Sequence, residues 1–310
     1  MHLHENAELF RDVVRAVSED QDDKDFAIIE KDYYVTMILK LLAEEVKDCV
    51  FKGGTALSKC YKVIDRFSED IDISFSNTLT QGQRKKLKDE TIAGISANLK
   101  MPIVNWEQAR SRRDYNCYIF DYQPIDGFVK ESLIPGVKME VVLSSLAFPA
   151  VEMEVTSLIY DFLKKDNAAL IEEYDLQPFK LKVQGLDRTF IDKTFAICDY
   201  YLQGKTERNS RHIYDLYMLA PKVKFDDNFA DLIKEVREQR LNLPACLSAQ
   251  PGVNVNELLK KIEDEKYFFN DYVSITSIFQ NKPLSYDEAI TVLKAIIESG
   301  VFAEAEQQKN

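Results

Sequence analysis

The sequence predicts an α+β fold, in which a mixed sheet with flanking helices is followed by a helical bundle. Three observations predict it. Residues 25–46 carry apolar side chains at helical spacing, residues 49–75 change to short apolar runs with period two, and the pattern becomes helical again from Leu186 onward. We therefore expect an α/β domain over residues 1–185 and a helical domain over residues 186–310.

The expected elements follow the chain in a simple order. "CVFKGG" (49–54) is an apolar strand ending in glycines, "TALSKCYKVI" (55–64) is a helix, and "DIDISF" (70–75) is an alternating strand. After a polar helical segment at about 80–99, four further strands extend the sheet, at 115–122, 137–145, 151–157 and 179–185. Five helices then follow, at 186–202, 210–220, 228–240, 256–273 and 285–299.

Composition and charge exclude some classes of protein. With 310 residues, 45% hydrophobic and 30% charged, the chain is ordinary for a globular protein, and its net charge of −12 argues against non-specific coating of nucleic acid. Three basic clusters interrupt this acidity: Arg84, Lys85, Lys86 and Lys88; Arg110, Arg112 and Arg113; and Lys205, Arg208 and Arg211. For the first we favour a solvated face; for the other two, a solvated face and a local basic cleft are equally favoured.

The cysteines and the hydropathy pattern indicate a cytoplasmic protein. Five cysteines stand far apart among apolar neighbours, which is typical of buried thiols rather than of a disulfide framework or a zinc site. The first residues have no signal-peptide pattern, and no stretch approaches the roughly 18 apolar residues of a membrane span.

Two adjacent glycines lie between the first strand and the helix that follows it. Gly53 and Gly54 let main-chain N–H groups approach a phosphate, and the start of the helix adds its positive end. Thr55 and Ser58 offer hydroxyls there, and Lys59 lies one turn inside the helix. Alone, the glycines are better explained by a tight turn.

The strand that follows carries an Asp-x-Asp alternation. Residues i and i+2 of a strand project from one face, so Asp70 and Asp72 would stand side by side while Ile71 and Ile73 enter the core. Adjacent carboxylates repel each other unless a cation intervenes, which favours Mg²⁺ or Mn²⁺ bound together with substrate phosphates. Alone, the pair is better explained by a solvated strand face. It is the order of glycine turn, helix and Asp-x-Asp that favours a functional site.

Two common nucleotide-binding motifs do not fit. The stretch lacks the Gly-x-x-x-x-Gly-Lys-Ser/Thr of a Walker P-loop and the Gly-x-Gly-x-x-Gly of a dinucleotide-binding fold. The arrangement instead resembles the polymerase-β-type nucleotidyltransferase fold, and more narrowly the AbiEii/AbiGii family of bacterial toxins. "KGGTALSK" (52–59) and "RFSEDIDISF" (66–75) resemble that family's first two motifs, and "EKDYYVTMIL" (30–39) is similar to its N-terminal helix.

The resemblance extends to two motifs in the helical region. "LDRTFIDKTFAI" (186–197) is similar to the third, which implies a catalytic role for Lys193 as a triphosphate ligand. "RHIYDLYML" (211–219) is similar to the fourth, which implies Asp215 as a catalytic residue able to accept the proton of the attacking hydroxyl. An ion pair between Asp215 and Arg211, one helical turn away, is the equally favoured structural explanation.

Polymerase-β-type enzymes also carry a third carboxylate on a neighbouring strand. Glu140 is the candidate, although AbiEii-type toxins often lack this residue and it could be a solvated position on an edge strand. The expected metal ligands are thus Asp70, Asp72 and, doubtfully, Glu140. The expected nucleotide-binding residues are Gly53, Gly54, Thr55, Ser58, Lys59 and Ser68.

The resemblance implies an Mg²⁺-dependent transferase that moves a nucleoside monophosphate from a nucleoside triphosphate to an acceptor hydroxyl. It implies a bacterial toxin with RNA, in particular the tRNA 3′ end, as acceptor and with a cognate antitoxin as partner. Two alternatives stay open at this point. One is a non-catalytic module of the same fold that binds a nucleotide or a protein partner, and the other is an antibiotic-modifying nucleotidyltransferase.

Overall fold

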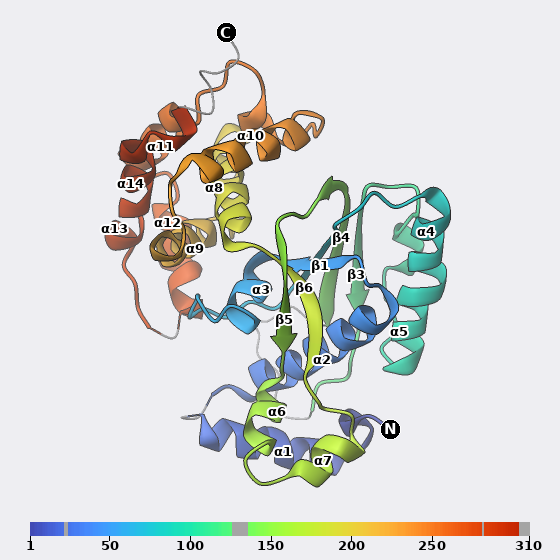
Figure 1. The fold of residues 1–310 in the computed structure, drawn as a ribbon. Coiled ribbons are helices and arrows are strands. Elements are labelled where there is room, and N and C mark those ends of the chain that lie inside the picture. Colours follow the sequence, from blue (N-terminus) through green and yellow to red (C-terminus); the bar gives the residue numbers. More distant parts are fainter. Residues whose placement is uncertain (22–23, 126–135, 281, 304–310) are drawn as a thin grey trace. The chain divides into compact units, whose positions relative to one another are not determined.

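The chain forms two compact units. The computed structural model describes residues 1–21, 24–125, 136–280 and 282–303. The first unit contains Met1–Cys60 and Ser68–Val183, and the second contains Tyr61–Phe67 and the chain from Gln184 onward (Figure 1). The short segment Tyr61–Phe67 therefore belongs to the second unit although the residues on both sides of it belong to the first.

A six-stranded mixed sheet forms the centre of the first unit, as the sequence predicts. The strands are β1 (Cys49–Lys52), β2 (Ile71–Phe75), β3 (Tyr115–Phe120), β4 (Val137–Leu146), β5 (Ala150–Val155) and β6 (Phe179–Gln184). Their order across the sheet is β3-β4-β2-β1-β6-β5. β2 runs antiparallel to β1 and parallel to β4. The strand before the glycine turn, β1, and the Asp-x-Asp strand, β2, are therefore neighbours in the sheet.

Helices surround this sheet. They are η1 (Leu3–Glu5), α1 (Ala7–Asp20), α2 (Phe26–Glu45), α3 (Gly53–Lys59), α4 (Gln81–Lys86), η2 (Leu87–Ile92), α5 (Ala93–Asn98), η3 (Trp106–Gln108), α6 (Leu158–Leu163) and α7 (Ala168–Glu173). The long α2 packs against α1, α5, α6 and β4. The helices expected at 25–46 and at about 80–99 are confirmed, but α3 ends at Lys59 instead of Ile64, because the residues after Cys60 belong to the second unit.

The second unit is helical from Leu186 onward, as expected. Its elements are α8 (Leu186–Leu202), α9 (Arg211–Leu219), η4 (Ala220–Lys222), α10 (Asp227–Leu241), η5 (Leu247–Ala249), α11 (Val255–Asp264), α12 (Phe269–Ser274), η6 (Thr276–Phe279), α13 (Tyr286–Ala289) and α14 (Thr291–Ser299). The single helix expected at 256–273 is two helices, since Lys266 adopts a left-handed φ of 46° and ends the first. The one expected at 285–299 is divided at Ile290.

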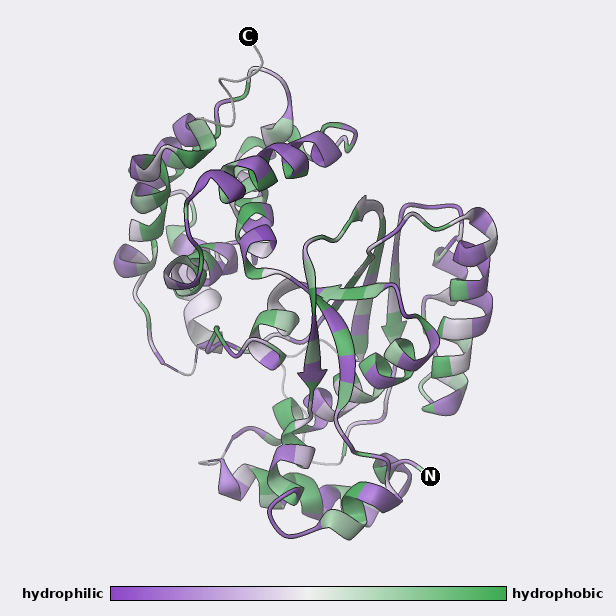
Figure 2. Cartoon of the chain, in the orientation of Figure 1, coloured by the Kyte–Doolittle hydropathy of each residue, from purple (hydrophilic) through white to green (hydrophobic). Residues whose placement is uncertain are grey.

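Hydrophilic and hydrophobic residues alternate around the helices of both units (Figure 2). None of the described helices is both long enough and apolar enough to cross a membrane. All five cysteines are free, and four are buried as expected. Cys117 is the exception, because it lies on β3 opposite Glu140, on the polar face of the sheet.

One buried carboxyl in the first unit makes stability depend on pH. Glu30 of α2 is 1% exposed and accepts a hydrogen bond of 3.0 Å from the N–H of Ile125. Burial raises the pKa of Glu30 to about 7, against 4.5 for the free side chain. The folded state therefore holds a proton that the unfolded chain releases, so Glu30 lowers stability as the pH rises from about 4.5 to about 7.

We expect Glu30→Gln to stabilise the protein above pH 7 and to have little effect at pH 4.5. Glutamine keeps the acceptor for Ile125 without a charge, and the shift corresponds to about 3 kcal/mol at 1.36 kcal/mol per pKa unit. Urea unfolding of both proteins at pH 4.5 and pH 8 measures this difference. Glu44→Gln, an exposed position on the same helix, is the control, and an equal effect of the two substitutions at pH 8 would contradict the assignment.

Candidate active site

The Asp-x-Asp strand presents its carboxylates as the alternation predicts. Ile71 and Ile73 are 0% and 1% exposed, whereas Asp70 and Asp72 are partly exposed. Asp70 directly precedes β2, and Asp72 lies within it. In the sheet register Asp72 is opposite Lys52 of β1 on one side and Glu140 of β4 on the other. One face of three adjacent strands therefore carries a lysine followed by two neighbouring carboxylates, with Asp72 in the middle.

Gly53 is required by the position of Asp72. Its φ is +78°, a conformation that side chains disfavour, and a Cβ atom built on it would lie 1.9 Å from Oδ2 of Asp72. The first residue of α3 and the carboxylate of β2 are thus in direct contact. The sequence shows only that the glycine turn precedes the Asp-x-Asp strand. The structure shows that the two motifs contact each other and form one site.

We expect Gly53→Ala to reduce at least a hundredfold the nucleotidyl transfer that the family resemblance implies, and to destabilise the protein by about 1–2 kcal/mol. The methyl group would displace the Asp72 carboxylate, and the left-handed backbone adds its own strain. Gly94→Ala is the matched control, because Gly94 lies in α5 with no atom within 4 Å of its Cβ position. Transfer rate and thermal unfolding test both variants, and a Gly53→Ala protein as active as Gly94→Ala would contradict this role.

The other expected nucleotide-binding residues of α3 have partners within the first unit. Thr55 is 4% exposed and donates from its hydroxyl to Ser68 Oγ at 3.0 Å, which joins the start of α3 to the segment before β2. Ser58 Oγ donates to the Thr55 carbonyl at 3.1 Å. Lys59 Nζ lies 2.5 Å from Oδ1 of Asp32 on α2. Its role as a phosphate ligand stays a prediction and requires the amine to leave Asp32.

Glu140, the doubtful third carboxylate, forms an ion pair with Lys138, two residues earlier on β4. It also accepts a hydrogen bond from the hydroxyl of Tyr115, whose pKa is raised by burial and by the charges of Glu140 and Asp72. Lys138 is in electrostatic contact with Asp70 as well, and Asp70 and Glu140 hold the pKa of its amine above the ordinary value although burial lowers it. A cation of the chain itself thus occupies the neighbourhood of Glu140.

The donor set fits a divalent cation that substrate phosphates help to hold. Oδ1 of Asp70 is buried and accepts no hydrogen bond from the described residues, so it is an acceptor that no described donor uses. Among those residues, no group of three or more His, Cys, Asp or Glu side chains is arranged to bind a metal ion by itself. Two carboxylates that need phosphate oxygens to complete the coordination are what Mg²⁺ bound with a nucleotide requires.

Lys193 and Asp215 meet in the second unit. Nζ of Lys193 on α8 lies 2.6 Å from Oδ2 of Asp215 on α9. Arg66 donates to the same carboxylate from Nε and from a terminal nitrogen, each at 2.7 Å. The three side chains are 6%, 0% and 6% exposed for Lys193, Asp215 and Arg66, so this is a buried charge cluster. The alternative pairing of Asp215 with Arg211 is replaced by these two contacts.

The cluster fixes the protonation of its members. Burial alone would raise the pKa of Asp215, but Arg66 and Lys193 outweigh it and hold this pKa well below its usual range. Burial lowers the pKa of the Lys193 amine, which Asp215 opposes. Asp215 is therefore ionised, and its carboxylate orients two cations.

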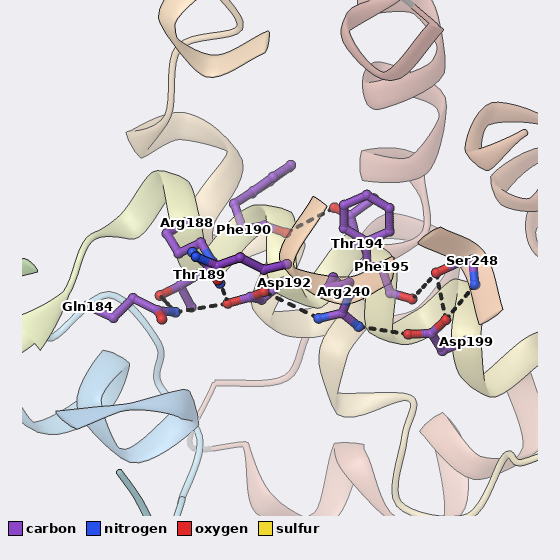
Figure 3. A network of polar contacts seen from close by, with 11 residues as sticks. Gln184, Arg188, Thr189, Phe190, Asp192, Thr194, Phe195, Asp199, Arg240 and Ser248 are labelled. Carbon is purple, nitrogen blue, oxygen red and sulfur yellow. Dashed lines mark hydrogen bonds and ion pairs between the residues drawn. The ribbon is translucent and has the colours of Figure 1, made fainter. Parts of the chain in front are cut away.

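A polar network joins α8 to its neighbours through residues that lie before and after Lys193 in the chain (Figure 3). Asp192 accepts hydrogen bonds from Arg188 Nε at 3.0 Å and from Gln184 Nε2 at 3.2 Å. Arg240 of α10 bridges Asp192 and Asp199 at 3.3 and 2.7 Å, and Asp199 also accepts from Ser248. The helix that carries Lys193 is thus held to α10 and η5 by charge-assisted bonds.

Several residues of these sites escape sequence reasoning. Arg66 is the first residue of the "RFSEDIDISF" motif, so its place in a recognised motif was the available signal. Asp32 and Tyr115 carry no comparable signal, since each acts through a partner that the fold brings from another element. Lys138 pairs with Glu140 two residues later on the same strand, and that spacing is visible in the sequence.

Comparisons with known proteins identify the family of the chain. The model of the family "Nucleotidyl transferase AbiEii toxin, Type IV TA system" matches residues 40–289. Among solved structures, the chain is similar to MenT4, a nucleotidyltransferase toxin from Mycobacterium tuberculosis H37Rv, with 16% identity and a TM-score of 0.45 over 95% of this chain and 99% of that one. A search of curated proteins gave no significant match.

The family match covers most of the chain, including the glycine turn, the Asp-x-Asp strand and the helices of Lys193 and Asp215. The chain belongs to the AbiEii family of nucleotidyltransferase toxins of type IV toxin–antitoxin systems. It is therefore a nucleotidyltransferase with a nucleoside triphosphate substrate, and its class of system includes an antitoxin.

Proposed function

We propose that this toxin transfers a nucleoside monophosphate from a nucleoside triphosphate to a hydroxyl at the 3′ end of an RNA, with tRNA as the leading candidate, in the cytoplasm. The observation that carries the proposal is the contact between Gly53 and the Asp72 carboxylate. It brings the N–H groups at the start of α3, which suit a phosphate, next to a carboxylate that suits the cation accompanying that phosphate.

In this proposal residues 1–185 form the nucleotidyltransferase domain, and residues 186–310 form a helical domain that contributes Lys193 and Asp215. Asp70 and Asp72 would hold Mg²⁺ or Mn²⁺, which when bound would neutralise phosphate charge. Gly53, Gly54, Thr55, Ser58 and Ser68 line the triphosphate, and Lys59 and Lys193 are the candidate cationic ligands. Glu140 is the least supported metal ligand, because Lys138 already neutralises it.

The chain's contribution to the reaction is positioning and charge balance. The acceptor hydroxyl releases its proton to water, its oxygen forms a bond to the α-phosphorus while the bond between that phosphorus and the α,β-bridging oxygen breaks, and pyrophosphate leaves with the electron pair of that bond. The sequence-based role of Asp215 as acceptor of the hydroxyl proton stays a prediction. Its lowered pKa and two cationic partners favour a different task, which is to hold Lys193 and Arg66 in fixed positions.

Incorporation of label from each α-³²P-labelled nucleoside triphosphate tests the proposal. The full chain is incubated with Mg²⁺ and total RNA, and the products are resolved into RNA, protein and small molecules. We expect label in RNA, and we expect it to disappear when the RNA is first oxidised with periodate, which destroys the terminal 2′,3′-diol. Label only in protein would refute the RNA acceptor, and label only in an added aminoglycoside would favour the antibiotic-modifying alternative.

A further inference from the structure

Two basic segments that are distant in the sequence are fastened together in the first unit. Gln81 Nε2 on α4 donates to Ser111 Oγ at 3.3 Å, and Arg84 donates to Asp114 Oδ1 at 2.8 Å. Lys88 Nζ donates to the carbonyl of Ala109 at 3.0 Å. The helix around residues 84–88 and the segment 109–114 therefore form one surface, although about twenty residues separate them in the chain.

This surface reverses the charge of the protein locally. We call it the basic surface, and it consists of Arg84, Lys85, Lys86, Lys88, Arg110, Arg112 and Arg113. Five of these seven cations are exposed, whereas the whole chain carries a net charge of −12. Arg84 is paired with Asp114, and Asp89, Glu90 and Glu107 flank the surface, so an excess of positive charge remains. In Figure 2 the ribbon of α4 is coloured mainly as hydrophilic.

The basic surface is followed in the chain by β3, whose first residue lies on the face of the sheet that carries Glu140 and Asp72. Tyr115 follows Asp114 as the first residue of β3, the strand at the edge of the sheet, and its side chain is 48% exposed. Its hydroxyl bonds to Glu140, whose register partner on the next strand is Asp72. β3 and the strand of Asp72 are two strand spacings apart in the sheet. Because neighbouring strands lie about 4.8 Å apart, the total separation is roughly 10 Å.

We infer that the basic surface and Tyr115 form the acceptor site, in which the cations bind the phosphates of a single-stranded RNA end and the tyrosine ring stacks on a base near its terminus. This inference rests on the proposed function, since it assigns the path by which the acceptor reaches Asp72. Arginine-rich surfaces beside a half-exposed aromatic ring are typical of single-strand binding, which combines backbone charge with stacking.

The experiment measures RNA binding without nucleotide or metal. Fluorescence anisotropy of a labelled single-stranded oligoribonucleotide is followed with the full chain between 50 and 200 mM salt. We expect Lys85→Ala/Lys86→Ala to weaken binding about tenfold and to reduce the slope of log K against log salt by about 1.4, at roughly 0.7 per lost phosphate contact. Tyr115→Leu should weaken binding about tenfold without changing that slope, because stacking releases no counterion.

Lys260→Ala/Lys261→Ala is the matched control. Lys260 and Lys261 are also adjacent and exposed in the last turns of a helix, α11, but lie in the second unit. The inference is overturned if the two double variants bind RNA equally well, or if wild-type protein binds no RNA at 50 mM salt. Displacement of the RNA by poly-glutamate at equal charge, together with normal binding by Tyr115→Leu, would overturn it in favour of an acidic protein partner.

These outcomes are independent of the transfer reaction. If wild-type protein binds RNA through Lys85 and Lys86 but labels no RNA, the proposed function fails and the acceptor surface stands as a binding site. If it labels RNA and the Lys85→Ala/Lys86→Ala variant binds and labels as well as wild type, the proposed function stands and this inference fails.

Discussion

Asp72→Asn is expected to reduce transfer of the nucleoside monophosphate about a thousandfold while the protein stays folded. Asparagine has the same shape as aspartate, so it fits the space that Gly53 leaves. It lacks the negative charge that would hold the divalent cation against the triphosphate, and ~4 kcal/mol of lost transition-state stabilisation corresponds to a thousandfold in rate. The label incorporated into RNA per minute, at saturating nucleotide and Mg²⁺, measures the effect.

Glu152→Gln is the control for this substitution. Glu152 lies on β5 of the same sheet and its side chain is 62% exposed, so the change removes one charge from the same unit without touching the site. Binding of Mn²⁺ in the presence of nucleotide, followed by electron paramagnetic resonance, should weaken in Asp72→Asn and stay unchanged in Glu152→Gln. An Asp72→Asn protein with full activity would show that the metal is held elsewhere.

Local pattern was sufficient for the elements that surround this carboxylate. The alternation of Asp70, Ile71, Asp72 and Ile73 predicts the strand and the buried face correctly, since strand periodicity depends only on neighbouring residues. Pattern failed where distant contacts decide. The expected helix of 55–64 stops at Lys59, because Asp65 donates its N–H to the Tyr214 hydroxyl and Arg66 binds Asp215 in the second unit.

The candidate site divides in the same way. Gly53 and Asp72 were predicted from a short stretch, and the structure adds that they touch. The partner of Asp215 could not be predicted, because Arg66 lies 149 residues earlier and local reasoning reaches only one helical turn, to Arg211. Lys59 was expected to face a phosphate, but its nearest carboxylate, Asp32, lies 27 residues away on α2.

Asp215→Asn is expected to destabilise the protein by about 3–5 kcal/mol and to abolish transfer. The substitution leaves Lys193 and Arg66 buried without a counter-charge, and an uncompensated buried cation is costly. The pKa of Asp215 is lowered in the folded state, so its contribution is present above the unfolded pKa of 3.8 and is lost as the pH falls below that value. The difference between wild type and variant, measured by urea unfolding, should therefore be constant from pH 8 to pH 5 and shrink below pH 4.

A double-mutant cycle with Lys193→Met separates support from chemistry. If Asp215 holds Lys193 through their 2.6 Å contact, Lys193→Met/Asp215→Asn should cost 1–3 kcal/mol less than the sum of the two single variants, since the second substitution removes a contact already lost. Additive losses would mean that the two side chains act independently. If Asp215 only positions Lys193, no proton is exchanged with Asp215, so the residual transfer by Lys193→Met should depend on pH as wild-type transfer does. If instead Asp215→Asn keeps normal stability and loses one ionisation from the pH profile of transfer, Asp215 is a proton acceptor.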